Sequence, residues 1–363
     1  MPLSTIKTAS LADNAVSTAK MANEALNGRR NLIINGAMQV AQRGTSFTNK
    51  STGAVYRLDR WEVSSFSDGD GEHNISQSTE APDGFTFSTK IECATQDTSQ
   101  DANNQFYYQQ QIEAQDINHL KFYESNPDSV TLSFHVRSNL TGTFPVALKI
   151  SDNNSVENNT ATRIYQVTYS VSAADTWEKK TVTFPLDSSS QTKPTGNNFG
   201  MAVQFWLGAG SSRDGATANA WGDNGNATIA ADNLDFLGST SNEWYLTGVQ
   251  LEVGSAALPF EYRPYGEELS LCQRYYSDGK EISGGGLAWY YSNNLGYTYA
   301  RAPISFPTTM RALPTVTVTT NPATPGTARG IQHRTTYGFS AYVNGLGSSD
   351  YVEIDEWTAD AEL

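Results

Sequence analysis

The sequence predicts an all-β protein whose main body is a two-sheet sandwich. Three observations lead to this fold class. Short apolar stretches alternate with polar residues at a period of two, clusters of Asp, Asn, Ser and Gly separate them, and no apolar run is long enough for a membrane-spanning helix. Strands with one apolar face, joined by polar turns, pair into two sheets that bury those faces against each other.

Residues 1–30 carry a repeat that neither a helix nor a strand explains. Apolar residues recur every five positions, at Ile6, Leu11, Val16, Met21 and Leu26. Because helices and strands have other periods, this spacing suits a chain that turns at each step, and such short units need neighbours to bury their apolar side chains. We interpret the segment as an intertwined shaft or as a docking segment that binds other proteins. The alternative is an Ala-rich leader that becomes ordered only on a partner.

Residues 31–264 are predicted to form one β-domain. In the segment 130–136, four apolar side chains fall on one face and the polar ones on the other. The same alternation predicts further strands over 144–150, 165–171, 177–186, 199–207 and 243–253. This series of one-sided strands supplies the two sheets of the sandwich.

Three segments of this domain are specific enough to indicate a family. Asn31–Gly44 reads NLIINGAMQVAQRG, and Asp59–Trp61 reads DRW. Leu246–Gly254 reads LTGVQLEVG and continues with PFEYRP over 259–264 and LCQRYY over 271–276. Together these segments resemble a group of bacteriophage tail-fibre and related virion proteins.

The resemblance covers roughly residues 31–276, with further similarity near the C-terminus. It implies that the sandwich is a jelly roll of the kind found in carbohydrate-binding modules. It also implies a virion protein assembled in the host cytoplasm. Two distant cysteines, expected to be free thiols, and an N-terminus without the apolar core of a signal peptide agree with that expectation.

Residues 265–363 are expected to form a short helix over 267–276 and then a smaller β-unit. Ten of the eighteen tyrosines lie in this part of the chain. Tyrosine favours interfaces because it offers a large amphipathic contact area at low entropic cost. The unit is therefore interpreted as a receptor-binding tip with glycan contacts at Tyr290, Tyr291 and Tyr297. The alternative is a trimerisation cap in which the tyrosines lie in the core or between subunits.

Trp206 is the tryptophan that the pattern singles out. In its strand the apolar residues share one face, which leaves Trp206 on the other face beside Gln204. An aromatic ring next to an amide can form a stacking platform for a sugar. The sequence therefore suggests Trp206 and Gln204 as glycan contacts, against the alternative that Trp206 packs under a loop or against a neighbouring subunit.

Two acidic clusters suggest a cation. Asp68, Asp70 and Glu72 alternate as in a calcium loop but lack the rest of the EF-hand pattern, so a solvated turn is the preferred interpretation. The other cluster is Asp223, Asp232 and Asp235, just before the closing strand. Carbohydrate-binding jelly rolls often hold a structural calcium ion, and these three aspartates are its candidate ligands here. No other cofactor is predicted.

Composition and motifs argue against several classes of function. A net charge of −14 is unsuited to nucleic acid, which requires a basic surface. The four histidines are isolated from one another and from the cysteines, so no zinc site is predicted. No nucleophile elbow or phosphate-binding glycine loop occurs in the sequence. Paired carboxylates can cleave polysaccharides, but that activity usually resides on a long β-helix, and the sequence has no such repeat.

The sequence thus predicts a non-enzymatic virion structural protein of the tail-fibre type. Its N-terminus would anchor it to other virion tail or capsid proteins, and it would attach to a glycan or protein of the host surface. A homotrimer is expected because closed cyclic symmetry suits an axial shaft. One alternative is an adaptor or a capsid or tail decoration protein without host contact; another is a polysaccharide-cleaving tailspike enzyme.

Overall fold

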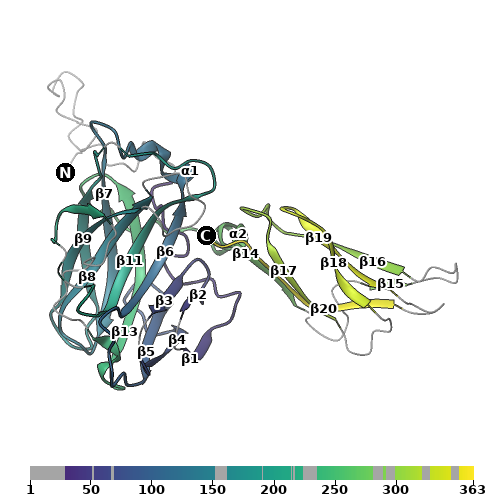
Figure 1. The fold of residues 1–363 in the computed structure, drawn as a ribbon, viewed down its shortest axis with the longest axis horizontal. Helices are drawn as coiled ribbons and strands as arrows, with labels where there is room; N and C mark the ends of the chain where they lie inside the picture. The colour runs from purple at the N-terminus through teal and green to yellow at the C-terminus, as the bar shows by residue number, and fades with distance from the viewer. Residues whose placement is uncertain are drawn as a thin grey trace, which may run out of the picture.

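The computed structural model describes residues 29–50, 53–66, 69–151, 162–189, 191–213, 215, 217–223, 235–280, 289–291, 299–320, 328–344 and 351–363. Figure 1 shows a large β-sandwich from which a smaller, elongated β-unit projects to one side. The prediction of an all-β fold is confirmed. No helix in the described part of the chain has the length and apolar character needed to cross a bilayer. The repeat Ile6–Leu26 lies outside the described residues.

Two antiparallel sheets form the sandwich, with strand orders typical of a jelly roll. The six-stranded sheet has the order β1 (Ser46–Lys50), β4 (Glu72–Ser78), β5 (Ser88–Thr95), β13 (Glu243–Val253), β7 (Ser129–Ser138), β10 (Glu178–Pro185). The seven-stranded sheet has the order β12 (Trp221–Asp223), β9 (Thr162–Val171), β8 (Gly142–Ser151), β11 (Phe199–Ala209), β6 (Gln105–Glu113), β3 (Glu62–Phe66), β2 (Gly53–Tyr56). A short helix, α1 (Ala114–Ile117), follows β6.

The core lies between the two sheets and is built from the apolar side of each strand. The four apolar residues predicted for the inner face of β7 are all fully buried, as are Phe205 of β11 and Trp244 of β13. Trp61, just before β3, stacks on Tyr108 of β6 with ring centroids 5.0 Å apart. Cys93 and Cys272 are buried free thiols, as predicted.

The segments that carry the family resemblance meet along one seam of the sandwich. The amide of Asn31 donates to the carbonyl of Val249 at 3.1 Å, and its oxygen accepts the N–H of Leu251 at 3.0 Å. The indole N–H of Trp61 donates to the carbonyl of Asn35 at 3.1 Å. Gly36 accepts the N–H of Val249 at 2.9 Å. The opening, central and closing segments are therefore hydrogen-bonded to one another.

The segment 259–264 holds the opening segment from the other side. The carboxylate of Glu261 accepts the backbone N–H groups of Arg30 at 2.6 Å and of Asn31 at 3.1 Å. Arg263 donates to the carbonyl oxygens of Asn31 and Ile33. These contacts satisfy backbone groups that lie outside the paired strands of either sheet. This role explains why the charged residues Glu261 and Arg263 lie between two prolines.

The smaller β-unit begins after helix α2 (Tyr265–Gln273), which starts two residues before its predicted position and ends three before. One sheet has the order β14 (Tyr276–Lys280), β20 (Tyr351–Asp360), β15 (Trp289–Tyr291), with β17 (Thr315–Thr320) also paired to β20. The other has the order β16 (Tyr299–Ser305), β19 (Gly338–Asn344), β18 (Ala328–Thr335). Its own core includes Phe306, Phe339 and Trp357.

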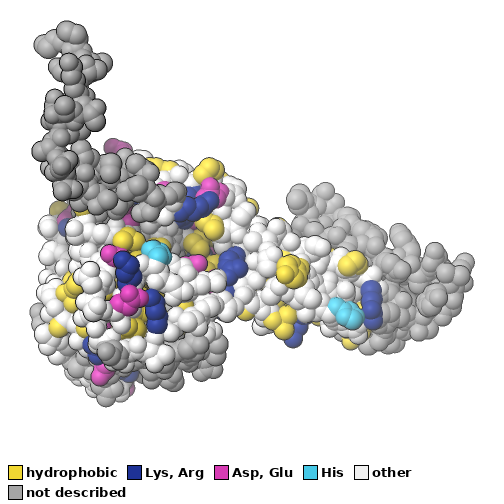
Figure 2. Space-filling view, turned by 90° about the horizontal axis from the view of Figure 1, so that it is seen from above, with side chains coloured by type: hydrophobic (Ala, Val, Ile, Leu, Met, Phe, Trp, Pro, Cys, Tyr) yellow, Lys and Arg dark blue, Asp and Glu magenta, His cyan; other side chains and the backbone are white. Residues whose placement is uncertain are grey.

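Charges of both signs are mixed on the surface of the sandwich. Figure 2 shows acidic and basic side chains interspersed on one of its faces. Many are paired: Lys90, for example, lies 2.6 Å from Glu92 and 3.0 Å from Glu243. The negative net charge is therefore not accompanied by a broad single-sign field on the face shown.

The seam predicts a sharp difference between two glycine substitutions. A Cβ atom on Gly36 would lie 2.1 Å from the carbonyl oxygen of Val249, so Gly36→Ala should destabilise the sandwich by about 2 kcal/mol or more. A Cβ atom on Gly266 in α2 would meet nothing within 4 Å, and Gly266→Ala should stabilise the chain by about 0.5–1 kcal/mol. Urea unfolding of both variants is the measurement; equal stabilities would contradict the packing described here.

Candidate functional site

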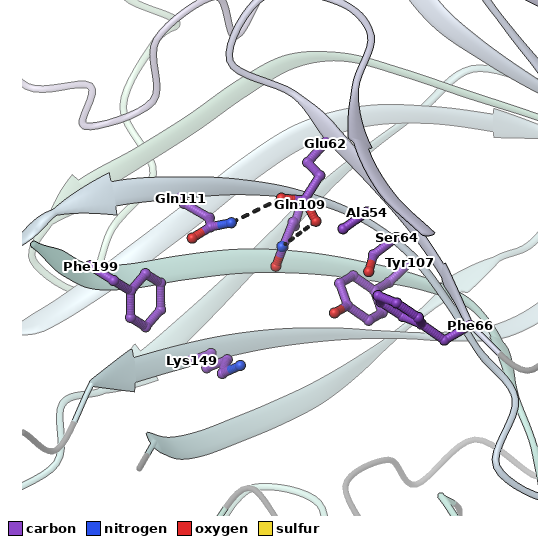
Figure 3. Close-up of a pocket in the computed structure, with 9 residues that line it drawn as sticks. All are labelled: Ala54, Glu62, Ser64, Phe66, Tyr107, Gln109, Gln111, Lys149 and Phe199. Carbon is purple, nitrogen blue, oxygen red and sulfur yellow. Dashed lines mark hydrogen bonds between the residues drawn. The ribbon is translucent and has the colours of Figure 1, made fainter. Parts of the chain in front are cut away.

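A pocket opens on the outer face of the seven-stranded sheet. Because Phe106, Tyr108 and Ile112 of β6 point into the core, the residues that alternate with them point outward. The pocket has an open volume of about 380 Å³, including its mouth. Its lining, drawn in Figure 3, is Ala54, Glu62, Ser64, Phe66, Tyr107, Gln109, Gln111, Lys149 and Phe199.

A chain of side-chain amides crosses the floor of the pocket and ends at Glu62. Strand register places Glu62 beside Gln109, and Gln109 beside Gln204. The amide of Gln204 donates to Gln109 at 2.8 Å, and the amide of Gln109 donates to the Glu62 carboxylate at 2.9 Å. Gln111 donates to the second carboxylate oxygen at 2.9 Å. Since each of these three amides donates to a defined acceptor, the network fixes the orientation of the amides.

Glu62 titrates in an unusual range because it is buried. Burial raises the pKa of Glu62 to about 7, and the hydrogen bonds from Gln109 and Gln111 oppose that rise. Both of its oxygens already accept a hydrogen bond. Glu62 therefore serves to orient the amides, which can present their remaining polar atoms to a ligand.

Lys149 brings a positive charge to the same pocket. It extends outward from β8, beside Ala202 of β11, and is 7% exposed. Its Nζ atom lies 5.9 Å from the centroid of the Phe199 ring. Burial lowers the pKa of Lys149 to about 8, and attraction to Glu62 offsets part of that effect. Lys149 and Glu62 are the two charged residues of the pocket lining.

Aromatic rings complete the lining. Phe66 is 39% exposed at the rim, while Phe199 is buried and Tyr107 half-buried. A pocket that combines rings with a few oriented polar groups suits a ligand having both an apolar face and hydrogen-bonding groups. This is the chemical capability of the site.

The structure corrects the prediction that Trp206 is an exposed platform. Trp206 does lie on the outer face of β11, but it is 2% exposed. Tyr107 covers it, with ring centroids 4.6 Å apart, and three further apolar residues pack around it: Ala147, Ile164 and Ala209. A sugar ring cannot stack on a tryptophan in this position. The alternating pattern predicted the correct face of the strand for Trp206, but such a pattern does not reveal what covers an outward-facing side chain.

Gln204 is corrected in the same way. It is buried, and its amide is engaged with Gln109. It therefore supports the pocket floor from below instead of contacting a ligand directly. Its neighbour in the lining, Gln109, is the amide that reaches the pocket.

The three tyrosines suggested for the smaller unit stay predictions. Tyr290 and Tyr291 belong to the short strand β15, and Tyr297 lies outside the described residues.

The described residues offer no support for the proposed calcium sites. Among them, no group of three or more His, Cys, Asp or Glu side chains could hold a metal ion. Asp223 accepts a hydrogen bond from Arg163 at 2.7 Å, so a cation there would have to displace the guanidinium. Asp235 is described, but Asp232 and Asp68 lie outside the described residues. Asp70 accepts two hydrogen bonds from Thr98, at 2.9 and 3.0 Å, which lower its pKa.

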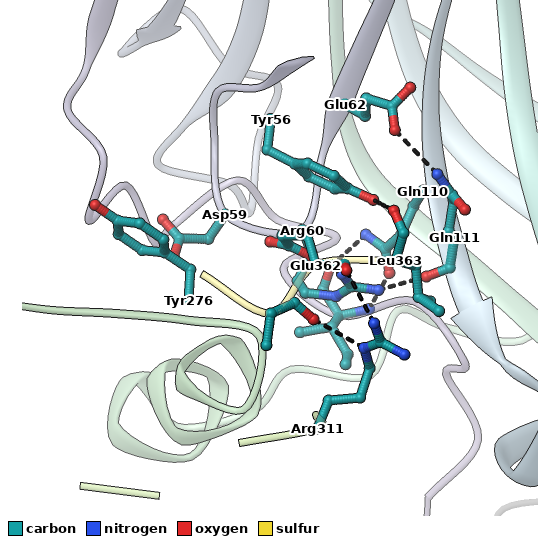
Figure 4. A network of polar contacts seen from close by, with 12 residues as sticks. Tyr56, Asp59, Arg60, Glu62, Gln110, Gln111, Tyr276, Arg311, Glu362 and Leu363 are labelled. Atoms are coloured by element: carbon teal, nitrogen blue, oxygen red, sulfur yellow. Dashed lines mark hydrogen bonds and ion pairs between the residues drawn. The ribbon is translucent and has the colours of Figure 1, made fainter. Parts of the chain in front are cut away.

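A buried polar joint connects the pocket's sheet to the end of the chain (Figure 4). Arg60, which is 1% exposed, pairs with the carboxylate of Glu362 and donates to the backbone carbonyl of Gln111. Its guanidinium carbon lies 3.4 Å from the centroid of the Tyr275 ring. Gln111 thus belongs to both features: its backbone binds Arg60 and its side chain binds Glu62.

Further contacts hold the last residues of the chain in this joint. Arg311 donates to the carbonyl oxygens of Ala361 at 2.8 Å and Glu362 at 2.9 Å. The hydroxyl of Tyr56 donates to the carbonyl of Leu363 at 3.1 Å. Arg43 lies 3.2 Å from a Glu362 carboxylate oxygen. The backbone N–H of Asn35 in the sandwich also donates to the carboxylate of Glu268 in α2. The smaller β-unit is therefore fastened to the sandwich through α2 and through the last residues of the chain.

Comparisons with known proteins place the chain in no family. No protein-family model and no curated protein matches the sequence. Among solved structures, the enzymatically active domain of tailspike protein 4 of bacteriophage CBA120 matches 61% of this chain with a TM-score of 0.31 and 10% identity. This chain spans 21% of the length of that tailspike protein chain.

Two carbohydrate-binding modules are also similar. The family 11 module of Clostridium thermocellum, solved with a mixed-linked tetrasaccharide, matches 58% of this chain and 96% of its own, with a TM-score of 0.28 and 8% identity. A xylan-binding domain of Paenibacillus barcinonensis matches 58% of this chain and 94% of its own, with a TM-score of 0.27 and 10% identity. Scores this far below 0.5 transfer no function to this chain.

The joint predicts a large effect of Glu362→Ala. Removing the carboxylate leaves the Arg60 guanidinium buried without the ion pair that Glu362 makes with it. The free energy of unfolding should therefore fall by about 3–5 kcal/mol. Glu124→Ala breaks an exposed pair with Lys193 and should cost less than about 1 kcal/mol. Urea unfolding of the two variants measures both; similar small losses would contradict a structural role for the joint.

Proposed function

We propose that this chain is a non-enzymatic virion protein of the tail-fibre type that binds a host-surface glycan. The glycan would occupy the pocket on the outer face of the seven-stranded sheet. Residues 1–30 would dock on other virion proteins, and three chains would assemble around a common axis. The resemblance of the seam segments to phage tail-fibre proteins supports the virion context.

The observation that carries the binding proposal is the oriented amide network beside aromatic rings. A sugar ring has hydroxyl groups around its edge and C–H groups on its faces. Gln109 and Gln111 can meet the hydroxyls, and Phe66 can cover a face. Because Glu62 holds both amides in place, little side-chain entropy is lost when a ligand binds.

The same pocket is poorly suited to cleaving the glycan. Glycoside hydrolysis generally uses two carboxyl groups on either side of the bond. The lining contains one, Glu62, and both of its oxygens accept hydrogen bonds from glutamines. This arrangement favours binding over the polysaccharide-cleaving alternative.

Filling the pocket should abolish glycan binding. Ala54 is an exposed residue of β2 at the pocket, so Ala54→Trp should block it and weaken binding at least tenfold. Phe66→Ala removes a rim ring and should weaken binding about fivefold. The measurement is binding of the full chain to an array of bacterial surface glycans.

Tyr337→Ala is the matched control, because Tyr337 is 68% exposed and lies in the smaller unit, between β18 and β19. It should bind like the parent. A parent chain that binds no surface glycan would favour an adaptor or decoration protein. Loss of binding in Tyr337→Ala alone would move the site to the smaller unit.

The docking proposal predicts the effect of removing residues 1–28. The shortened chain keeps Arg30 and its contact with Glu261, so its fold should be unchanged. It should fail to enter virions when it replaces the parent during phage assembly, as measured by immunoblot of purified particles. Normal incorporation would contradict docking through this segment.

A further inference from the structure

We propose that the pocket selects an acidic sugar, with the carboxylate of a uronic acid residue bound beside the ammonium group of Lys149. This inference rests on the proposed glycan-binding function and adds the class of sugar.

Geometry is the first argument. Figure 3 shows Lys149 across the pocket from Glu62, with Gln109 and Gln111 nearer to Glu62. A sugar whose hydroxyls reach the amides can therefore direct a ring substituent towards Lys149. Phe199 lies beside that position, with the ammonium nitrogen 5.9 Å from its ring centroid.

The charge of the lining is the second argument. At neutral pH Lys149 is mostly cationic because its pKa is about 8, whereas Glu62, with a pKa of about 7, is only partly ionised. The remaining titratable group of the lining is Tyr107, whose pKa is raised to about 12 and which stays neutral. The lining therefore combines one mostly protonated amine with one partly protonated carboxyl group, in a chain with a net charge of −14.

Desolvation is the third argument. Lys149 is almost fully buried, and within the lining Glu62 attracts its ammonium group. A ligand carboxylate would be a further acceptor for that ammonium group, in a pocket already shielded from water. Since the lining holds a single cation, a singly charged carboxylate matches it better than a dianionic phosphate.

The test compares acidic polysaccharides with their carboxyl-reduced forms. Each member of a panel of uronate-containing bacterial polysaccharides is used in its native form and with its carboxylates reduced to alcohols, against the full chain. We expect carboxyl reduction to weaken binding about 10- to 100-fold for the members that bind. In Lys149→Met that difference should disappear. Lys179→Met, which removes an exposed lysine of the other sheet, should keep it.

A pH titration of the parent chain gives a second readout that needs no variant. Affinity for the acidic form should fall as pH rises from 7 to 9, because Lys149 loses its proton and Glu62 becomes fully ionised. Affinity for the carboxyl-reduced form should change far less over the same range.

Two results would overturn the proposal in distinguishable ways. Equal or tighter binding of the carboxyl-reduced or neutral forms, blocked by Ala54→Trp, would refute selection of acidic sugars and leave the glycan-binding proposal standing. No binding of any charged or neutral glycan would refute both.

Discussion

The buried guanidinium of Arg60 is the group on which the arrangement of this chain depends. A cation that is 1% exposed needs a carboxylate, and Glu362 supplies it from the far end of the sequence. Arg60 also ties the start of β3 to the backbone of Gln111, whose side chain holds Glu62. Arg60 therefore contributes both to the docking of the last residues of the chain and to the order of the pocket floor.

The residues that carry the resemblance to phage tail-fibre proteins make contacts that hold the fold together, and they do not form the pocket. Asn31, Gly36 and Arg263 connect backbone segments along the seam, and Arg60 connects the two β-units. None of them lines the pocket. The proposed ligand site is formed instead by other residues, among them outward-facing residues of β3, β6 and β8.

The fold was largely predictable because strand alternation is a local property. The inner face of β7 and the position of a helix soon after Pro264 follow from nearby residues alone. The site was not predictable, because Glu62 and Gln109 meet only through the pairing of β3 with β6. The single local signal was the alternation of Tyr107, Gln109 and Gln111 on one side of β6. Trp206 shows the limit of such patterns, since Tyr107 covers it.

Hydrogen–deuterium exchange of the full chain, with and without a bound surface glycan, tests the central claim most directly. If the sandwich pocket is the binding site, the glycan should slow exchange in peptides covering β3, β6 and β8 and leave β18 and β19 unchanged. Slower exchange confined to the smaller β-unit would contradict the account and place ligand binding on the projecting unit.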